Sequence, residues 1–263
     1  MPGTLVSFHA HPDDEAIITG GSLARAARAG HRVELVYATR GEVGEVEDGV
    51  LGPGEALAQR RVDEARQAAA VLGVARVEFL GYRDSGMAGA PENDADGVFW
   101  QADVEEAAAR LAAILHEERA EVLTTYDERG AYGHPDHVQV HRVGVRAAQL
   151  DSTPRLYAAT IDRDHIVELL RARAVQLGEI PDSPDPDTFD VGVDGSRITT
   201  TVDVSAVIDS KRAAMAAHAS QIPEGSFFLA LDGPAFREAF GTEWFIRLDH
   251  APAAPESWLF DAE

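Results

Sequence analysis

Short apolar segments alternate with longer amphipathic segments over the first 160 residues of the chain. The short segments have the length of strands, and each contains β-branched or aromatic residues: Leu5–His9, Val33–Ala38, Val77–Leu80, Val122–Tyr126 and Pro154–Thr160. The longer segments are rich in alanine and have helical periodicity: Ala16–Ala29, Glu55–Leu72, Val104–Glu118 and His137–Leu150. Strands that alternate with helices pair in parallel. The pattern therefore predicts an α/β, Rossmann-like fold, with a mostly parallel sheet and helices on both faces.

The pattern is less regular after residue 160. Ile180–Asp190 contains several Pro and Asp residues and predicts a loop, Asp203–Ala219 predicts a helix, and Trp244–Leu248 predicts a late strand. No internal repeat or long linker divides the chain. We therefore expect a single domain over residues 1–263, with a core over residues 1–160. An irregular C-terminal extension over residues 161–263 is expected to shape the substrate pocket.

The charge and composition exclude several classes of function. The formal net charge of −22 argues against nucleic acid or an anionic membrane as a partner. The absence of cysteine removes thiolate metal ligands and a cysteine nucleophile. No segment approaches the roughly 20 apolar residues that span a bilayer. We expect a cytoplasmic protein that acts on a small molecule, either as a monomer or as a homo-oligomer.

The first predicted strand leads directly into the sequence AHPDDE, residues 10–15. In an open parallel sheet, ligands bind beyond the carboxyl ends of the strands. A dinucleotide-binding protein has glycines at this point, whereas an imidazole and neighbouring carboxylates suit a cation. Proline followed by acidic residues is also a good start for a helix, which is the simpler interpretation of this stretch. That interpretation does not explain His11.

A second, similar sequence, YGHPDH, occupies residues 132–137, soon after the fourth predicted strand. A doubly wound fold can bring both sequences to one edge of the sheet. His11, Asp14 and His137 would then form a shell of two histidines and one carboxylate, with a coordination position open for water, as catalytic zinc sites have. Asp13, next to a ligand, would act as the base toward that water.

Two other histidines remain alternative ligands. His141 lies four residues after His137, on the same face of the predicted helix, and His9 lies two residues before His11. Roles in packing or in support of the ligands are the simpler interpretation of both.

The two motifs at this spacing resemble those of the PIG-L/LmbE-like family of zinc-dependent N-deacetylases, and the resemblance extends over essentially the whole chain. The mycothiol-pathway members are the most similar. Three further stretches resemble stretches in those enzymes: Gly41–Glu45, Arg83–Met87 and Thr125–Asp127. A fourth, Ala217–Gln221, resembles a late stretch of the family.

The resemblance implies a role for each residue of the site. It makes His11, Asp14 and His137 the metal ligands and Asp13 the general base. The residues of the second motif would act on the charged intermediate: His134 in its protonated form, with Asp136 orienting it and Tyr132 donating its hydroxyl to the oxyanion. Arg61 and Asp84 match positions that hold sugar or inositol hydroxyls.

The resemblance also implies the activity. We expect a hydrolase that uses Zn²⁺, with Fe²⁺ as the alternative ion, to remove an acyl group from the amide nitrogen of a small sugar-like or glycoside substrate. Acetyl is the expected acyl group. A mycothiol S-conjugate amidase and a tailoring deacetylase of secondary metabolism are the alternatives within this chemistry. A nucleotide-binding module without catalysis and a catalytically inactive relative are alternatives outside it.

Overall fold

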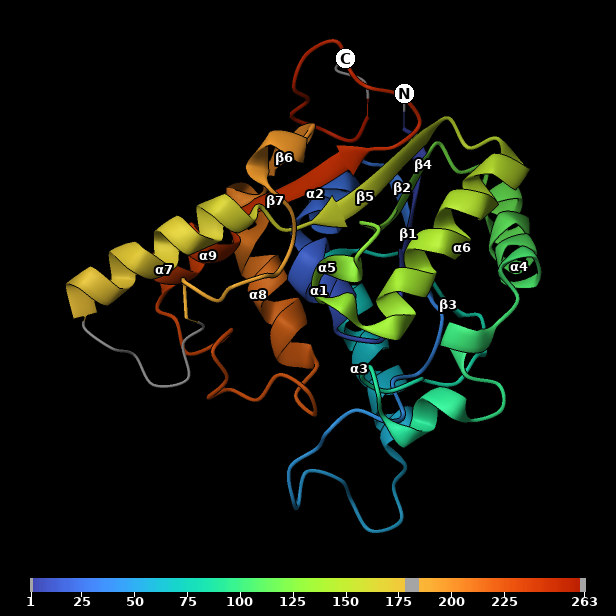
Figure 1. Ribbon diagram of the computed structural model, residues 1–263, viewed down its shortest axis with the longest axis horizontal. Coiled ribbons are helices and arrows are strands. Elements are labelled where there is room, and N and C mark those ends of the chain that lie inside the picture. Colours follow the sequence, from blue (N-terminus) through green and yellow to red (C-terminus); the bar gives the residue numbers. More distant parts are fainter. Residues whose placement is uncertain (1, 178–184, 261–263) are drawn as a thin grey trace.

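The computed structural model describes residues 2–177 and 185–260. Within them, seven strands form one sheet in the order β3-β2-β1-β4-β5-β7-β6 (Figure 1). The strands are β1 Thr4–His9, β2 Arg32–Tyr37, β3 Arg76–Phe79, β4 Val122–Tyr126, β5 Arg155–Thr160, β6 Thr200–Asp203 and β7 Thr242–Arg247. Strands β1 to β5 pair in parallel, whereas β7 is antiparallel to both β5 and β6. The predicted mostly parallel sheet is confirmed.

Helices cover both faces of the sheet because successive strand residues point to opposite sides. In β1, Leu5 packs in one apolar cluster, whereas Val6 and Phe8 pack in another. Helices α2, α3 and α8 contribute to the first cluster, and α4 and α6 to the second, where they lie side by side (Figure 1). The α-helices are α1 Asp14–Ile18, α2 Gly20–Arg28, α3 Leu57–Leu72, α4 Val104–Glu118, α5 Gly130–Gly133, α6 Pro135–Asp151, α7 Arg163–Leu177, α8 Ile208–Ala217 and α9 Gly233–Phe240.

Four short 3₁₀ helices complete the described elements. They are η1 Pro91–Asp94, η2 Phe99–Gln101, η3 Gly195–Arg197 and η4 Ser205–Val207. None of the described helices is long and apolar enough to cross a membrane.

Several elements differ from the prediction. The expected helix over 16–29 starts earlier and is interrupted at Thr19, which separates α1 from α2. The sequence pattern does not predict α7, α9 and β6, although Ile166, Leu169 and Leu170 of α7 have helical spacing. β6 has only four residues, too few for a clear alternation. The loop expected over 180–190 lies partly outside the described residues, and residues 186–188 form a turn.

The strand order places the ends of β1 and β4 next to each other. From β1 the chain continues to β2 and β3 on one side, and later returns to β4 and β5 on the other side. Connections that leave neighbouring strands in opposite directions open a crevice at their carboxyl ends. The loop after β1 begins the AHPDDE sequence, and the loop after β4 leads to YGHPDH. Both motifs therefore meet at this crevice.

Candidate active site and metal centre

A cavity of about 1320 Å³ opens at this crevice. Its lining includes residues of both motifs, among them His11, Asp13 and His137. The loop after β4 is held by the buried carboxylate of Asp127, which accepts hydrogen bonds from the Ala131 N–H at 3.2 Å and the Thr160 hydroxyl at 2.6 Å. This turn directs the chain into α5 and then α6, so the second motif follows a fixed path toward the first.

Three histidines from the two motifs form a buried cluster. Nitrogen atoms of His11, His134 and His137 all lie within 4.8 Å of one another, a spacing that could hold a metal ion. The ring centroid of His11 is 4.7 Å from that of His134 and 5.4 Å from that of His137. The two motifs, about 120 residues apart in the sequence, thus supply donors to one point.

Asp14 lies between two of these histidines. One carboxylate oxygen is 3.5 Å from His11 Nδ1, and the other is 3.3 Å from His137 Nε2. The His137 Nε2 atom is buried and has no hydrogen-bond partner in the described part of the chain. An unpaired buried nitrogen is unfavourable unless another group binds it. Because imidazole nitrogens and carboxylate oxygens are the ligands that zinc takes in proteins, the predicted set of His11, Asp14 and His137 fits a metal ion.

The two alternative ligands have protein partners instead. His9 Nδ1 lies 2.8 Å from the Tyr126 hydroxyl, and its Nε2 lies 2.7 Å from the Ser7 hydroxyl. Burial lowers the pKa of His9 to about 4, so this ring is a neutral part of the core. His141 Nδ1 lies 2.8 Å from the Tyr126 carbonyl oxygen. These contacts favour the supporting roles expected for both histidines.

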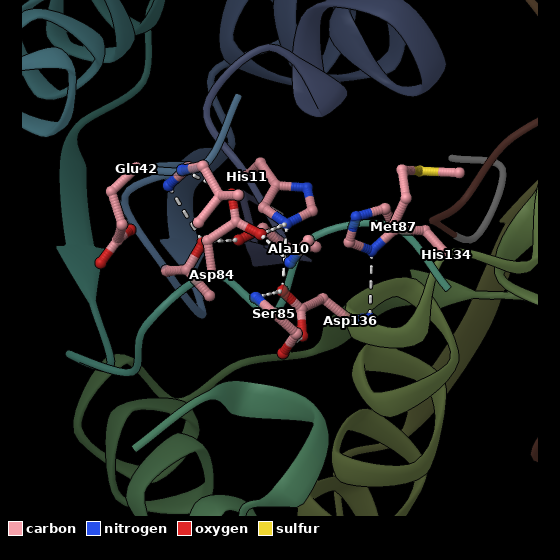
Figure 2. A network of polar contacts seen from close by, with 12 residues as sticks. Ala10, His11, Glu42, Asp84, Ser85, Met87, His134 and Asp136 are labelled. Carbon is pink, nitrogen blue, oxygen red and sulfur yellow. Dashed lines mark hydrogen bonds and ion pairs between the residues drawn. The ribbon is translucent and has the colours of Figure 1, made fainter. Parts of the chain in front are cut away.

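Two carboxylates face the second ring nitrogen of His11 (Figure 2). His11 Nε2 is 3.2 Å from Asp136 and 3.5 Å from Asp84. Burial alone would lower the pKa of His11, but Asp136, Asp14 and Asp84 together raise it well above its usual range. Histidines that bind metals commonly donate their other N–H to a carboxylate, which fixes the tautomer and the ring. Asp136 is therefore placed to orient His11, and Ser85 holds it there through its N–H and hydroxyl at 3.0 and 2.5 Å.

The predicted partner of Asp136 was His134, and the structure changes how the two interact. The Asp136 backbone N–H donates to His134 Nδ1 at 3.1 Å, because His134 is the N-cap of α6, whereas the Asp136 carboxylate faces His11 and Ser85. Nδ1 therefore carries no proton. Burial, together with the neighbouring His11 and His137, lowers the pKa of His134 to about 4. The resting His134 is a neutral ring that can donate only from Nε2, so the expected protonated form would have to give up this cap.

Asp13 lies beside the histidine cluster with an unusual backbone conformation. Its φ is 120° and its ψ is −34°, outside the regions that residues other than glycine normally adopt. Burial raises the pKa of its carboxylate to about 6, although Arg61 opposes the rise. A carboxylate with this pKa accepts a proton near neutral pH, as the predicted base must.

The two residues expected to hold sugar hydroxyls both line the cavity, yet both terminal nitrogens of Arg61 and both carboxylate oxygens of Asp84 are hydrogen-bonded to protein. Arg61 is buried and donates to the Gly41 and Pro12 carbonyl oxygens at 2.8 and 2.6 Å, and to Asp13 at 3.1 Å. Asp84 accepts from the backbone N–H groups of Val43 and Gly86 at 3.2 and 2.9 Å. Their contact with substrate stays a prediction. The structure shows that both already hold the loops of the site.

Tyr132 stands at the edge of the cavity. Its side chain is among the exposed large ones, and its ring centroid lies 4.9 Å from that of His137. The preceding Ala131 has a φ of 62°, which turns the chain sharply just before the tyrosine. Tyr132 also lines the cavity, and its hydroxyl stays the predicted donor to the oxyanion.

The remaining wall of the cavity is largely apolar. It is formed by side chains of α7, the segment between α7 and β6, the loop before α9, α9 and β7: Ile166, Leu169, Leu170, Phe189, Val191, Phe227, Phe228, Leu231, Phe240 and Trp244. All of these residues lie after residue 160, and the expectation that this part of the chain shapes a substrate pocket stays a prediction.

Two buried residues near the site had no role in the sequence-based prediction. The carboxylate of Glu15 lies 2.6 Å from His218 Nε2, and neither side chain is exposed. Both belong to stretches that carry the family resemblance, Ala10–Glu15 and Ala217–Gln221. The resemblance of these stretches was the available signal, but their contact across 203 positions was not predictable from it.

Comparison with known proteins identifies the family of this chain. The family model described as "PIG-L: GlcNAc-PI de-N-acetylase" matches residues 6–148. The chain is 42% identical to a 1D-myo-inositol 2-acetamido-2-deoxy-alpha-D-glucopyranoside deacetylase of Thermomonospora curvata, over 97% of this chain and 95% of that protein. It is also 42% identical to the enzyme of that name from Acidothermus cellulolyticus, over 94% and 89% of the two chains.

Solved structures share the fold at lower identity. The N,N'-diacetylchitobiose deacetylase from Pyrococcus horikoshii matches with a TM-score of 0.62 and 21% identity, over 93% of this chain and 83% of that one. The zinc inhibited form of teicoplanin deacetylase Orf2 matches with a TM-score of 0.61 and 20% identity, over 94% and 99%.

Proposed function

This chain belongs to the PIG-L family of GlcNAc-PI de-N-acetylases, and we propose that it is a zinc-dependent hydrolase that removes an acetyl group from the amide nitrogen of a small sugar-like substrate. The observation that carries the proposal is the convergence of His11, Asp14 and His137 in one large cavity, with the Asp13 carboxylate beside them. Relatives about 40% identical carry the name of a deacetylase of an N-acetylglucosaminyl inositol. That glycoside is therefore the first substrate to test.

We assign His11, Asp14 and His137 as the metal ligands. The unpaired Nε2 of His137 and the approach of Asp14 to both rings support this choice. The donor set suits zinc and would also accept iron(II). When bound, such an ion lowers the pKa of water toward about 7 and polarises the amide carbonyl.

The protein's own residues then handle the protons. Asp13, whose pKa burial raises to about 6, can take a proton from the attacking water. As the carbon–nitrogen bond breaks, the same carboxyl group can pass that proton to the departing nitrogen, which leaves as an amine. One residue thus serves as base and then as acid, and acetate is the second product.

Two donors can meet the negative charge that develops on the carbonyl oxygen. His134 is a neutral ring whose Nδ1 is occupied, so it offers Nε2–H. Tyr132 lines the same cavity and offers its hydroxyl. A donor placed at a developing oxyanion typically contributes about 3 kcal/mol to the stabilisation of the transition state.

The proposal is tested by the release of acetate. The zinc-loaded protein should release acetate from N-acetylglucosaminyl inositol with a turnover between about 1 and 10³ s⁻¹, the usual range of enzymes. Removal of the ion with a chelator should abolish the release, and added zinc should restore it. A protein that binds NAD or a nucleotide and releases no acetate would instead be a binding module. A protein that holds zinc but releases no acetate from any N-acetyl sugar would be a catalytically inactive relative.

The size and lining of the cavity favour a second candidate substrate. Pockets for drug-sized ligands commonly have volumes of about 300–1,000 Å³, whereas this cavity reaches about 1320 Å³. A sugar joined to inositol has no apolar group to place against Phe228, Leu231 and Phe240. A glycoside or conjugate with a large nonpolar substituent would fill that wall, as in a mycothiol S-conjugate amidase or a tailoring deacetylase.

A pair of glycosides tests this second candidate. The octyl glycoside of N-acetylglucosamine has seven more methylenes than the methyl glycoside, and each buried methylene contributes about 0.8 kcal/mol. Even partial burial of the chain predicts a kcat/KM at least about 10²-fold higher for the octyl compound. Phe240→Ser should lower the octyl-to-methyl ratio of kcat/KM by a larger factor than it lowers kcat/KM for the methyl compound itself. Equal kcat/KM values for the two glycosides in the wild-type protein would exclude the apolar subsite.

A further inference from the structure

The backbone of Asp13 is held in an unfavourable conformation by several contacts at once. Its φ of 120° is strained for a residue with a side chain. Such a conformation persists only where the surrounding structure determines it from more than one side. The Asp13 N–H donates to a carboxylate oxygen of Glu15 at 3.0 Å, and its carbonyl oxygen accepts from the N–H of Ala16 at 3.1 Å.

Helix α3 holds the Asp13 side chain. Arg61 of this helix donates to the Asp13 carboxylate at 3.1 Å and, with the same nitrogen, to the Pro12 carbonyl oxygen at 2.6 Å. Only 4% of the Arg61 side chain is exposed, so the contact is shielded from competing water. Arg61 therefore fixes the peptide before Asp13 and its side chain together.

The chain after α8 holds Glu15. His218 is the C-cap of α8, and its Nε2 lies 2.6 Å from one oxygen of the Glu15 carboxylate. The other oxygen accepts a hydrogen bond from the Asp13 N–H. Neither side chain of the Glu15–His218 pair is exposed to solvent. Glu15 therefore connects a histidine late in the sequence to the backbone of the base.

The same segment after α8 also contacts α3. Ser220 donates to both oxygens of Glu64, from its N–H at 2.9 Å and from its hydroxyl at 2.6 Å. Glu64 lies three residues after Arg61, on the same face of α3. The contacts thus form a closed ring from Arg61 through Asp13, Glu15, His218 and Ser220 to Glu64.

We propose that His218 is a positioning residue that acts, through Glu15 and this ring, on the conformation of the catalytic base Asp13. The proposal rests on the proposed deacetylase function. His218 lies behind Glu15 and does not line the cavity, so it does not bind the substrate. Its effect on catalysis passes through the Asp13 backbone, because a misplacement of a catalytic group by about 1 Å can lower the rate about 10²-fold.

The central test is His218→Leu, which removes the hydrogen bond to Glu15 and fills the site with an apolar side chain of moderate size. We expect kcat to fall by about 10- to 100-fold, while KM changes by less than about threefold and the zinc content is unchanged. His218→Gln can still donate from its amide nitrogen to Glu15 and should recover most of the kcat. Ser220→Ala opens the ring at a second contact with little loss of volume, and it serves if His218→Leu does not fold.

A double-mutant comparison separates positioning from general destabilisation. In an Asp13→Ala background the ring has no base to position, so adding His218→Leu should change the residual kcat by less than about twofold. Thr200→Val, at the far edge of the sheet, removes another buried hydrogen bond and should lower Tm without this coupling. The proposal would be overturned if His218→Leu lowered kcat by the same factor in both backgrounds. It would also be overturned if His218→Leu left the kcat of the otherwise wild-type protein unchanged, or if the variant lost its zinc.

A crystal structure of His218→Leu provides a readout that does not depend on activity. We expect Asp13 to leave its positive φ when the ring is opened. If the wild-type protein releases no acetate, the proposed function fails, but the structure of the variant still tests the ring. A backbone of Asp13 that stays at a φ near that of the wild type would overturn the positioning role.

Discussion

Replacement of Asp13 with alanine should lower kcat by about 10²- to 10⁴-fold, the usual contribution of general acid–base catalysis. The carboxylate lies beside the ligand cluster, and burial raises its pKa to about 6, which suits a group that takes up and returns a proton near neutral pH. Asp13 is not among the proposed ligands, so the zinc content should remain that of the wild-type protein. Steady-state rates of acetate release, measured together with the bound metal, check both parts of the prediction.

Two variants serve as controls for Asp13. Asp13→Asn keeps the shape of the side chain and can still accept a hydrogen bond from Arg61, but it cannot take up the proton, so it should lose nearly as much activity as the alanine variant. Asp63→Ala removes a mostly exposed aspartate of α3 and should leave kcat unchanged. Loss of zinc from Asp13→Ala would make Asp13 a ligand. Activity within about tenfold of the wild type would remove Asp13 from the central step.

Replacement of His137 with alanine should abolish both zinc binding and activity. His137 contributes the buried Nε2 that lacks a hydrogen-bond partner within the described residues, and two remaining ligands make a poor zinc site. A ligand that binds only the folded state stabilises it by about 2.7 kcal/mol at a concentration 100 times its Kd. The rise in Tm that zinc causes in the wild-type protein should therefore disappear in the variant. Metal analysis after dialysis and thermal unfolding with and without zinc measure the two effects.

His141→Ala is the matched control, one turn further along α6. His141 is bonded to the Tyr126 carbonyl oxygen, so this variant should keep its zinc and the zinc-dependent rise in Tm. If His141→Ala loses the ion while His137→Ala retains it, the ligand set is wrong. In that case His11, Asp14 and His141 would be the set to examine next.

The sequence by itself determined the sheet and the edge at which the site lies. Apolar segments of strand length that alternate with amphipathic helices leave a parallel α/β arrangement as the stable way to bury both faces. In such a sheet the carboxyl ends of the strands share one edge, so motifs that follow β1 and β4 meet there whatever the details of their loops. For this reason the order of the residues along the chain is enough to group His11, Asp14 and His137.

The tertiary structure decided which atoms these residues contact. The sequence indicated that Arg61 and Asp84 belong to the site, but their donors and acceptors turn to neighbouring loops. The sequence paired Asp136 with His134, yet its carboxylate faces His11 and Ser85. The partner of a polar side chain depends on the relative placement of separate loops to within about 1 Å, because a hydrogen bond weakens steeply outside its short range. Periodicity and motif spacing do not contain that information.

The strained conformation of Asp13 and the elements after residue 160 were likewise decided by the tertiary structure. The Asp13 residue itself gives no signal of a positive φ, since this conformation is held by the side chains of Glu15, two residues later, and of Arg61 in α3. The four-residue strand β6 and the eight-residue helix α9 are similar cases, because short elements gain little stability from local propensity and depend on the surface against which they pack. Residue pattern determined the fold and the chemical groups of the site. Contacts between segments far apart in the chain determined their conformations and partners, because only the folded structure brings those segments within hydrogen-bonding distance.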